Sequence, residues 1–198
     1  MSLIDPRKTS FVPIKSRGEL PHLYKDGGVY FVTFRLADAV LYNAPPSILP
    51  QNPTSEDIAR ACEPPLTLGS CVLRQPDIAQ LVQNALQHFE GERYLLGAWC
   101  IMPNHVHVIF GPLAGHSPSQ VLQSWKGFTA RRANQLLGKS GAFWERESFD
   151  HLIRNTESME WFVEYIHQNP VKAGLCKQPS DWSYSSAGQA FTTRIFET

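Results

Sequence analysis

The sequence predicts an α+β fold, in which a ferredoxin-like antiparallel sheet has helices packed on one face. Two observations predict it: strand-like and helical segments follow in the order strand, helix, two strands, helix, strand, and a short connection joins the two middle strands. Of the 198 residues, 42% are hydrophobic. This length is enough for one well-buried core. We therefore expect a single domain over residues 1–198.

The first half of the chain supplies one strand and one helix. Residues 29–36, VYFVTFRL, are rich in β-branched and aromatic side chains and predict a core strand. Residues 43–65 contain six prolines, which interrupt strands and helices. We expect a proline-rich insertion there, with at most a short turn at 55–62. Pro76 then begins a helix that extends to about Phe89, because apolar residues recur at helical spacing.

A hairpin and a second helix follow. Residues 94–100 and 105–110 read as neighbouring antiparallel strands, since the connection between them is only four residues long. Ser117 is a typical helix cap, and Pro118 is favoured in the first helical turn. We expect this helix to continue to about Leu137.

The last predicted elements are a short strand and a third helix. Residues 149–154 are interpreted as the strand, and Asn155 as the cap of the helix that follows. This C-terminal helix contains Tyr165, and we expect Pro170 to end it. The tail at about 183–198 has no clear pattern.

Charge and cysteine content narrow the classes of protein. The chain has 18 basic and 18 acidic residues, so any surface for a polyanion must be a local basic cluster. Its four cysteines form no C-x-x-C pair, which argues against a zinc ribbon and fits a reducing compartment. Neither an apolar leader nor a membrane-length apolar run is present. We expect a soluble, cytoplasmic protein.

The most informative local pattern is the pair His105 and His107 in the second strand of the hairpin. Because side chains alternate along a strand, both imidazoles lie on one face while Val106 and Val108 point to the other. Two imidazoles side by side suit a shared cation. The alternative is an ordinary pair of half-exposed histidines.

A third ligand must come from elsewhere, and the C-terminal helix offers one. Tyr165 and Asn169 are four residues apart and share a helical face. Asn169 stands just before Pro170, where its amide oxygen could reach a metal. The alternatives are a core tyrosine and a helix-capping asparagine. His167 projects away from Tyr165 and is the weaker candidate.

Two longer runs carry a resemblance to a known family. Residues 99–108 read WCIMPNHVHV, and residues 165–175 read YIHQNPVKAGL. Together they resemble the single-tyrosine HUH transposases, and the closer match is to the REP-associated tyrosine transposases, whose name refers to repetitive extragenic palindromes. The resemblance extends from about 29 to 186, but the proline-rich residues 43–65 are not matched. Supporting matches lie at 124–126, 128–134, 144–145, 149–154 and 182–186.

This resemblance implies a transposase that cuts and rejoins single-stranded DNA beside hairpin, or palindromic, elements. Tyr165 on the C-terminal helix would be the nucleophile and would form a 5′-phosphotyrosine intermediate. His105, His107 and Asn169 would hold one divalent metal, Mg²⁺ or Mn²⁺. Family members act as monomers or homodimers, and in dimers the tyrosine of one chain can serve the other. No nucleotide cofactor is expected, and the sequence has no phosphate-binding P-loop motif.

Local basic residues are the expected DNA contacts, although each is also compatible with an ordinary surface charge. They are Arg35, Lys126, Arg131, Arg132, Arg154 and Lys172. Two other classes of function compete with the transposase. One is a domesticated relative that binds hairpins without cutting them, and the other is a metal-binding protein unrelated to DNA.

Overall fold

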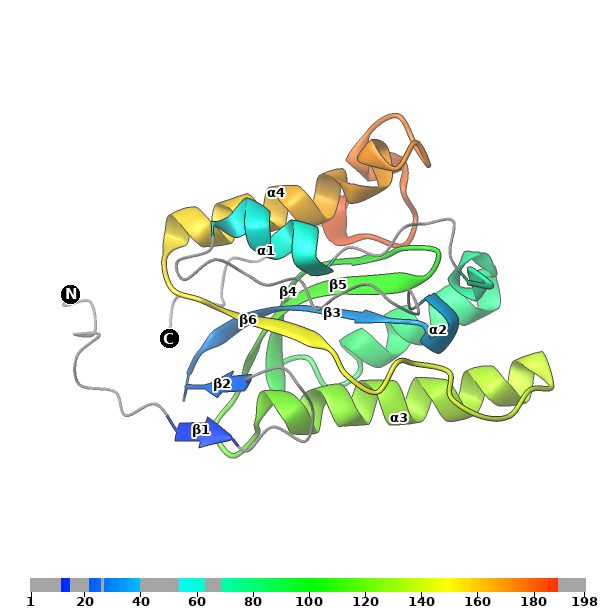
Figure 1. Ribbon diagram of the computed structural model, residues 1–198, viewed down its shortest axis with the longest axis horizontal. Helices are drawn as coiled ribbons and strands as arrows, with labels where there is room; N and C mark the ends of the chain where they lie inside the picture. Colours follow the sequence, from blue (N-terminus) through cyan, green and yellow to red (C-terminus); the bar gives the residue numbers. More distant parts are fainter. Residues whose placement is uncertain (1–11, 15–21, 26, 40–53, 63–68, 189–198) are drawn as a thin grey trace.

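The computed structural model describes residues 12–14, 22–25, 27–39, 54–62 and 69–188 (Figure 1). Its strands are β1 (Val12–Ile14), β2 (His22–Tyr24), β3 (Val29–Arg35), β4 (Tyr94–Ile101), β5 (His105–Pro112) and β6 (Phe149–Ile153). Its α-helices are α1 (Ser55–Cys62), α2 (Pro76–Gln87), α3 (Pro118–Leu137) and α4 (Thr156–Lys172). Short 3₁₀ turns lie at Ala37–Ala39, Val72–Arg74, Pro179–Asp181 and Ser186–Gly188.

Four strands form one antiparallel sheet in the order β4-β5-β3-β6. Helix α2 connects β3 to β4, and α3 connects β5 to β6, which is the ferredoxin-like order. The α+β class and the antiparallel sheet are thus confirmed. The strands β1 and β2 form a separate two-stranded pair, which the sequence patterns did not predict.

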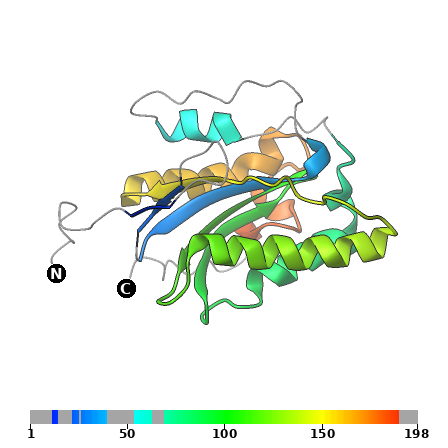
Figure 2. The same ribbon diagram turned by 60° about the horizontal axis from the view of Figure 1, so that its bottom comes forward.

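The expectation that all helices share one face of the sheet is wrong for α4. Helices α2 and α3 cover one face, and α4 lies across the other (Figures 1 and 2). The reason is visible in β3, where the neighbouring residues Tyr30 and Phe31 point to opposite faces and are both fully buried. A central strand that is apolar on both sides needs cover on both sides. Phe162 and Ile166 of α4 supply it over Phe31.

The ends of α3 and α4 follow from local chemistry. Ser117 and Gln120 form a capping box at the start of α3, and Gly138 ends that helix in the left-handed conformation, with φ 61°. The Asn155 side chain caps α4. The helix does not end at Pro170 as expected, but continues to Lys172. Pro170 lacks an N–H donor, but the turn that follows it is closed by Ala173 N–H donating to the Asn169 carbonyl, at 3.0 Å.

Two stretches expected to be irregular contain defined structure. Within the proline-rich insertion, α1 forms a helix at 55–62 where only a turn was expected, and its Ile58 is buried against the α4 side of the core. The remaining residues of the insertion, 43–53 and 63–65, lie outside the described residues. Residues 183–188 are held on β4, because Ile101 N–H donates to the Tyr184 carbonyl at 2.9 Å. The tail at 189–198 lies outside the described residues.

Among the helices that the structure describes, none has the length and apolar character required to cross a membrane.

Candidate active site

The histidine pair lies at the start of β5, on the face that α4 covers. Val106 and Val108 belong to the hydrophobic cluster of the opposite face, so the predicted alternation holds. Both imidazoles are fully buried, and their Nε2 atoms are 3.0 Å apart. The rings therefore converge on one point between β5 and α4.

The other nitrogen of each ring is held by a neighbour. His105 Nδ1 donates to the Asn104 amide oxygen at 2.8 Å, which leaves its Nε2 with a lone pair. His107 Nδ1 is 2.7 Å from the buried hydroxyl of Thr33, its cross-strand partner on β3. A hydrogen bond at Nδ1 is how proteins usually aim Nε2 at a metal.

Burial keeps both imidazoles neutral, which is the form that binds metals. It lowers the pKa of His107 to about 3. Burial also holds the pKa of His105 well below its ordinary range, and the nearby charges of His107 and Arg35 act in the same direction. Neither ring thus carries a proton on both nitrogens near neutral pH.

Helix α4 brings Asn169 to the pair. Its side chain is buried, and its Nδ2 lies 3.3 Å from His107 Nε2. The amide oxygen sits on the same carbon, so a half-turn of the amide group puts the oxygen where Nδ2 is. Asn169 is therefore close enough to be a third ligand beside the two imidazoles.

These three side chains fit one divalent ion. Two nitrogens about 2.1 Å from a metal and at a right angle to each other lie about 3 Å apart, which matches the spacing of the Nε2 atoms. Within the described ranges, no third His, Cys, Asp or Glu joins them. A set of two imidazoles and one amide oxygen leaves positions open for water or a phosphate oxygen.

Tyr165 completes the cluster from the same face of α4. Its ring centre is 5.3 Å from that of His107, and it stacks on Trp161 at 5.4 Å with the planes 7° apart. The ammonium of Lys172 lies 5.6 Å above the tyrosine ring. The chain thus brings together two neutral imidazoles from β5 with a phenol, an amide and a cation from α4.

Comparison with known proteins identifies the family of the chain. The family model described as "Transposase IS200 like" matches residues 72–169, a stretch that contains both histidines, Tyr165 and Asn169. The chain belongs to the IS200-like transposase family.

The chain is also similar in sequence to individual proteins of this kind. It is 30% identical over 108 residues to the REP-associated tyrosine transposase of Escherichia coli, covering 54% of this chain and 63% of that protein. A Haemophilus influenzae protein described as "Putative REP-associated tyrosine transposase" is 30% identical over 112 residues, covering 50% of this chain and 62% of the relative. The match thus spans less than two thirds of each relative's length.

A solved structure shares the fold. It is a REP-associated tyrosine transposase bound to a REP hairpin, with a TM-score of 0.57 and 22% identity. The similarity covers 87% of this chain and 84% of that one.

The structure separates the predicted basic residues of this family member into two groups. Arg35 forms an ion pair with Glu145, with Nη2 to Oε1 at 3.1 Å. The Lys126 ammonium donates to the carbonyls of Arg146 and Glu147 and to the hydroxyl of Ser148, and burial lowers its pKa to about 8. The remaining four are exposed at the surface: Arg131, Arg132, Arg154 and Lys172.

His167 lies away from the histidine pair, whereas two residues that the sequence did not single out hold its imidazoles. His167 Nε2 lies 2.9 Å from the Ser186 hydroxyl rather than at the histidine pair. The roles of Thr33 and Asn104 were not predicted. Asn104 directly precedes His105, which is a usable signal, whereas Thr33 is identified only by the pairing of β3 with β5.

Proposed function

We propose that the protein cuts and rejoins single-stranded DNA beside hairpin elements, with Tyr165 as the nucleophile. The observation that carries this proposal is the meeting of Tyr165 with the histidine pair, at 5.3 Å between the His107 and Tyr165 rings. The family supports it, because it consists of transposases. The hairpin substrate is taken from the solved relative, whose structure holds a REP hairpin.

The proposed step conserves the energy of the broken bond. The Tyr165 oxygen attacks phosphorus, a P–O bond to tyrosine forms, and the P–O3′ bond breaks. The phenol proton leaves to solvent, and the departing 3′-oxygen takes up a proton to become a free 3′-hydroxyl. Attack by a 3′-hydroxyl on the 5′-phosphotyrosine reverses the chemistry and rejoins DNA without a nucleotide cofactor.

The roles of the chain's own residues follow from their positions. His105, His107 and Asn169 would hold Mg²⁺ or Mn²⁺, which when bound polarises the phosphate and stabilises its developing negative charge. Trp161 stacks on Tyr165 and limits its rotation. The Lys172 ammonium lies 5.6 Å from the centre of the Tyr165 ring, so it is a proposed contact to the DNA backbone beside the nucleophile. The exposed Arg131, Arg132 and Arg154 are proposed contacts to the DNA backbone.

One chain contains every residue of this site. Tyr165 lies beside the histidines of its own chain, which supports a monomer that uses its own tyrosine. A dimer is not required by the geometry.

A covalent assay tests the nucleophile. The full chain, incubated with hairpin-bearing single-stranded DNA and Mn²⁺, should form a protein–DNA adduct that survives denaturation. Tyr165→Phe should form none, while the control Tyr184→Phe, on the segment that packs on β4, should retain it. An adduct that persists in Tyr165→Phe would overturn the assignment. Salt-dependent hairpin binding without any adduct in the wild type would instead identify a non-catalytic DNA-binding protein.

A further inference from the structure

Arg35 lies beside the histidine pair, on the same face of the sheet. It is the cross-strand partner of His105, and Thr33, two residues earlier on β3, bonds His107 on that face. Because side chains alternate along a strand, the Arg35 side chain leaves β3 on the α4 side, next to the side chain of His105. The charge of Arg35 contributes to the low pKa of His105, as expected for neighbours. Arg35 thus borders the candidate active site at its His105 end.

The Arg35 guanidinium is held in one orientation by Glu145. Its Nε and Nη2 groups donate to the two oxygens of the Glu145 carboxylate, with Nη2 to Oε1 at 3.1 Å. Such a bidentate pair fixes the plane of a guanidinium. The pair uses two of the five N–H donors of an arginine, and 33% of the Arg35 side chain is exposed. The other three N–H groups can therefore donate to a substrate.

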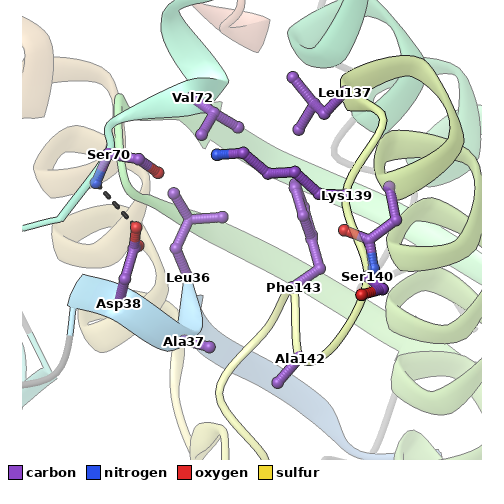
Figure 3. A pocket seen from close by; sticks show the side chains of 11 residues that line it. Leu36, Ala37, Asp38, Ser70, Val72, Leu137, Lys139, Ser140, Ala142 and Phe143 are labelled. Atoms are coloured by element: carbon purple, nitrogen blue, oxygen red, sulfur yellow. Dashed lines mark hydrogen bonds between the residues drawn. The ribbon is translucent and has the colours of Figure 1, made fainter.

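Glu145 itself is fixed by the end of β3. Its N–H donates to the Arg35 carbonyl at 2.9 Å, and the preceding residue, Trp144, pairs with Leu36. Leu36 and Trp144 point to the α2 and α3 side of the sheet, where Leu36 lines a cavity of about 270 Å³ (Figure 3). On that side the Trp144 indole donates to the Thr129 hydroxyl at 2.8 Å. Arg35 and Glu145 consequently meet on the opposite face, which is the face of the histidine pair.

The position of Arg35 complements that of Tyr165. The Tyr165 ring lies toward the start of β3, with its centre 6.0 Å from that of Phe31 and 5.3 Å from that of His107. Arg35 lies further along β3, in the row of His105. A phosphate bound at the histidine pair is therefore bordered by Tyr165 on one side and by Arg35 on the other.

We infer that Arg35 is a second catalytic residue, whose guanidinium donates to a non-bridging oxygen of the phosphate that Tyr165 attacks. When the tyrosine oxygen adds to phosphorus, negative charge accumulates on the non-bridging oxygens. A guanidinium that is already held in place stabilises this charge without reorganising, and it gives up no proton. Glu145 is the positioning residue that holds it. This inference rests on the proposed function, because the phosphate belongs to the substrate of that reaction.

The rate of the covalent step tests the role of Arg35. The full chain is mixed with a saturating concentration of hairpin-bearing single-stranded DNA and Mn²⁺, and the tyrosine adduct is followed over time. Arg35→Met keeps the aliphatic stem but removes the donors, and we expect the adduct to form about 100-fold more slowly. Arg35→Lys keeps the charge without the bidentate geometry and should lose about tenfold. The control Arg93→Met, at the opposite end of the sheet beside Tyr94, should react as fast as the wild type.

Two binding measurements show whether the covalent step itself is slowed. Affinity for Mn²⁺, measured by isothermal titration calorimetry, and affinity for the hairpin, measured by fluorescence anisotropy in EDTA, should stay within about threefold of the wild type in Arg35→Met. An adduct rate that stays within about threefold of the wild type would overturn the inference. A loss of Mn²⁺ or hairpin affinity large enough to account for the slower rate would also overturn it, because Arg35 would then support binding and not the covalent step.

Substitution of Glu145 separates catalysis from charge balance. Without Arg35, the Glu145 carboxylate is left unpaired beside the site and repels the phosphate. In Arg35→Met/Glu145→Gln this carboxylate is gone, and we expect the adduct rate to stay as low as in Arg35→Met. Recovery of the wild-type rate would overturn the inference, since Arg35 would then only neutralise Glu145.

The positioning role of Glu145 has its own readout. Glu145→Gln alone keeps one acceptor oxygen but loosens the hold on Arg35, and it should slow the adduct about three- to tenfold. The same substitution should have no further effect in the Arg35→Met background, because there is no guanidinium left to hold. An equal loss in both backgrounds would show that Glu145 does not act through Arg35.

The outcomes separate this inference from the proposed function. An adduct at Tyr165 that forms at the same rate with and without Arg35 would refute the role of Arg35 alone. The absence of any adduct in the wild type would refute the proposed function, and the role of Arg35 with it.

Discussion

Thr33 and His107 are cross-strand partners whose side chains are joined by a buried hydrogen bond of 2.7 Å. Thr33→Val has nearly the same shape but removes the hydroxyl, which leaves the ring free to turn its Nε2 away from the metal. We expect affinity for Mn²⁺, measured by isothermal titration calorimetry, to fall about 10- to 100-fold. Thr33→Ser keeps the hydroxyl and should bind within a few-fold of the wild type. Equal Mn²⁺ affinity in the valine variant would show that Thr33 does not orient His107.

The two histidines and Thr33 show which part of the site could be predicted from the sequence. Alternation along a single strand is a local property, so the shared face of His105 and His107 follows from their spacing. The partner of His107 depends instead on how β3 pairs with β5, and a shift by one residue would replace Thr33 with a neighbour that points to the other face. The residue pattern of a single strand does not show in which register it pairs with another strand.

Lys126 connects α3 to the segment at 146–148 that leads into β6. Its ammonium makes three hydrogen bonds there, and the residue is half-buried. Lys126→Met keeps the aliphatic stem and removes the donors, and we expect the free energy of unfolding in urea to fall by about 1–2 kcal/mol. The control Lys139→Met, on an exposed lysine just beyond α3, should change stability little. A full loss of hairpin affinity in Lys126→Met at unchanged stability would instead identify Lys126 as a DNA contact.

The exposed face of α3 should act on DNA through charge. Arg131 and Arg132 are exposed neighbours on this helix. If each neutralises one phosphate, replacing both with alanine should weaken hairpin binding for every sequence tested. The slope of log K against log salt should become shallower by about 2. Binding measured at several salt concentrations tests this, and an unchanged slope would show that α3 faces away from the DNA.

The ends of the helices could be predicted better than their placement. The cap at Ser117 and the end of the helix at Gly138 depend on residues close together in the sequence, and the structure has both. The position of α4 over the second face was not predicted, because a run such as 29–36 that is apolar on both sides does not say which element covers each side. The continuation of α4 past Pro170 was not predicted because an interior proline usually ends or kinks a helix, whereas here Ala173 N–H closes the next turn on the Asn169 carbonyl.

The two-sided core of the protein buries three histidines wholly or in part. His151 on β6 is the cross-strand partner of Phe31 and lies 5.7 Å, ring to ring, from Phe162. Burial lowers the pKa of His151 to about 4, and the charge of Arg154 adds to the effect. His105 and His107 have their pKa values shifted in the same direction. Folding therefore favours the uncharged form of all three rings.

This burial predicts that the metal-free protein is destabilised by acid at mildly acidic pH. Below the ordinary histidine pKa of about 6.5 the unfolded chain takes up a proton at residue 151, whereas the folded chain does so only near pH 4. Because the unfolded state binds more protons in this window, stability is fully present above pH 6.5 and is lost as the pH falls toward 4. The slope from His151 is at most about 1.4 kcal/mol per pH unit, and smaller because the ring is partly exposed to solvent.

Urea unfolding in EDTA between pH 7 and pH 5 measures this dependence of the free energy of unfolding on pH. His151→Gln should flatten the dependence, the exposed control His88→Gln should not, and equal slopes for His151→Gln and the wild type would show that His151 does not contribute.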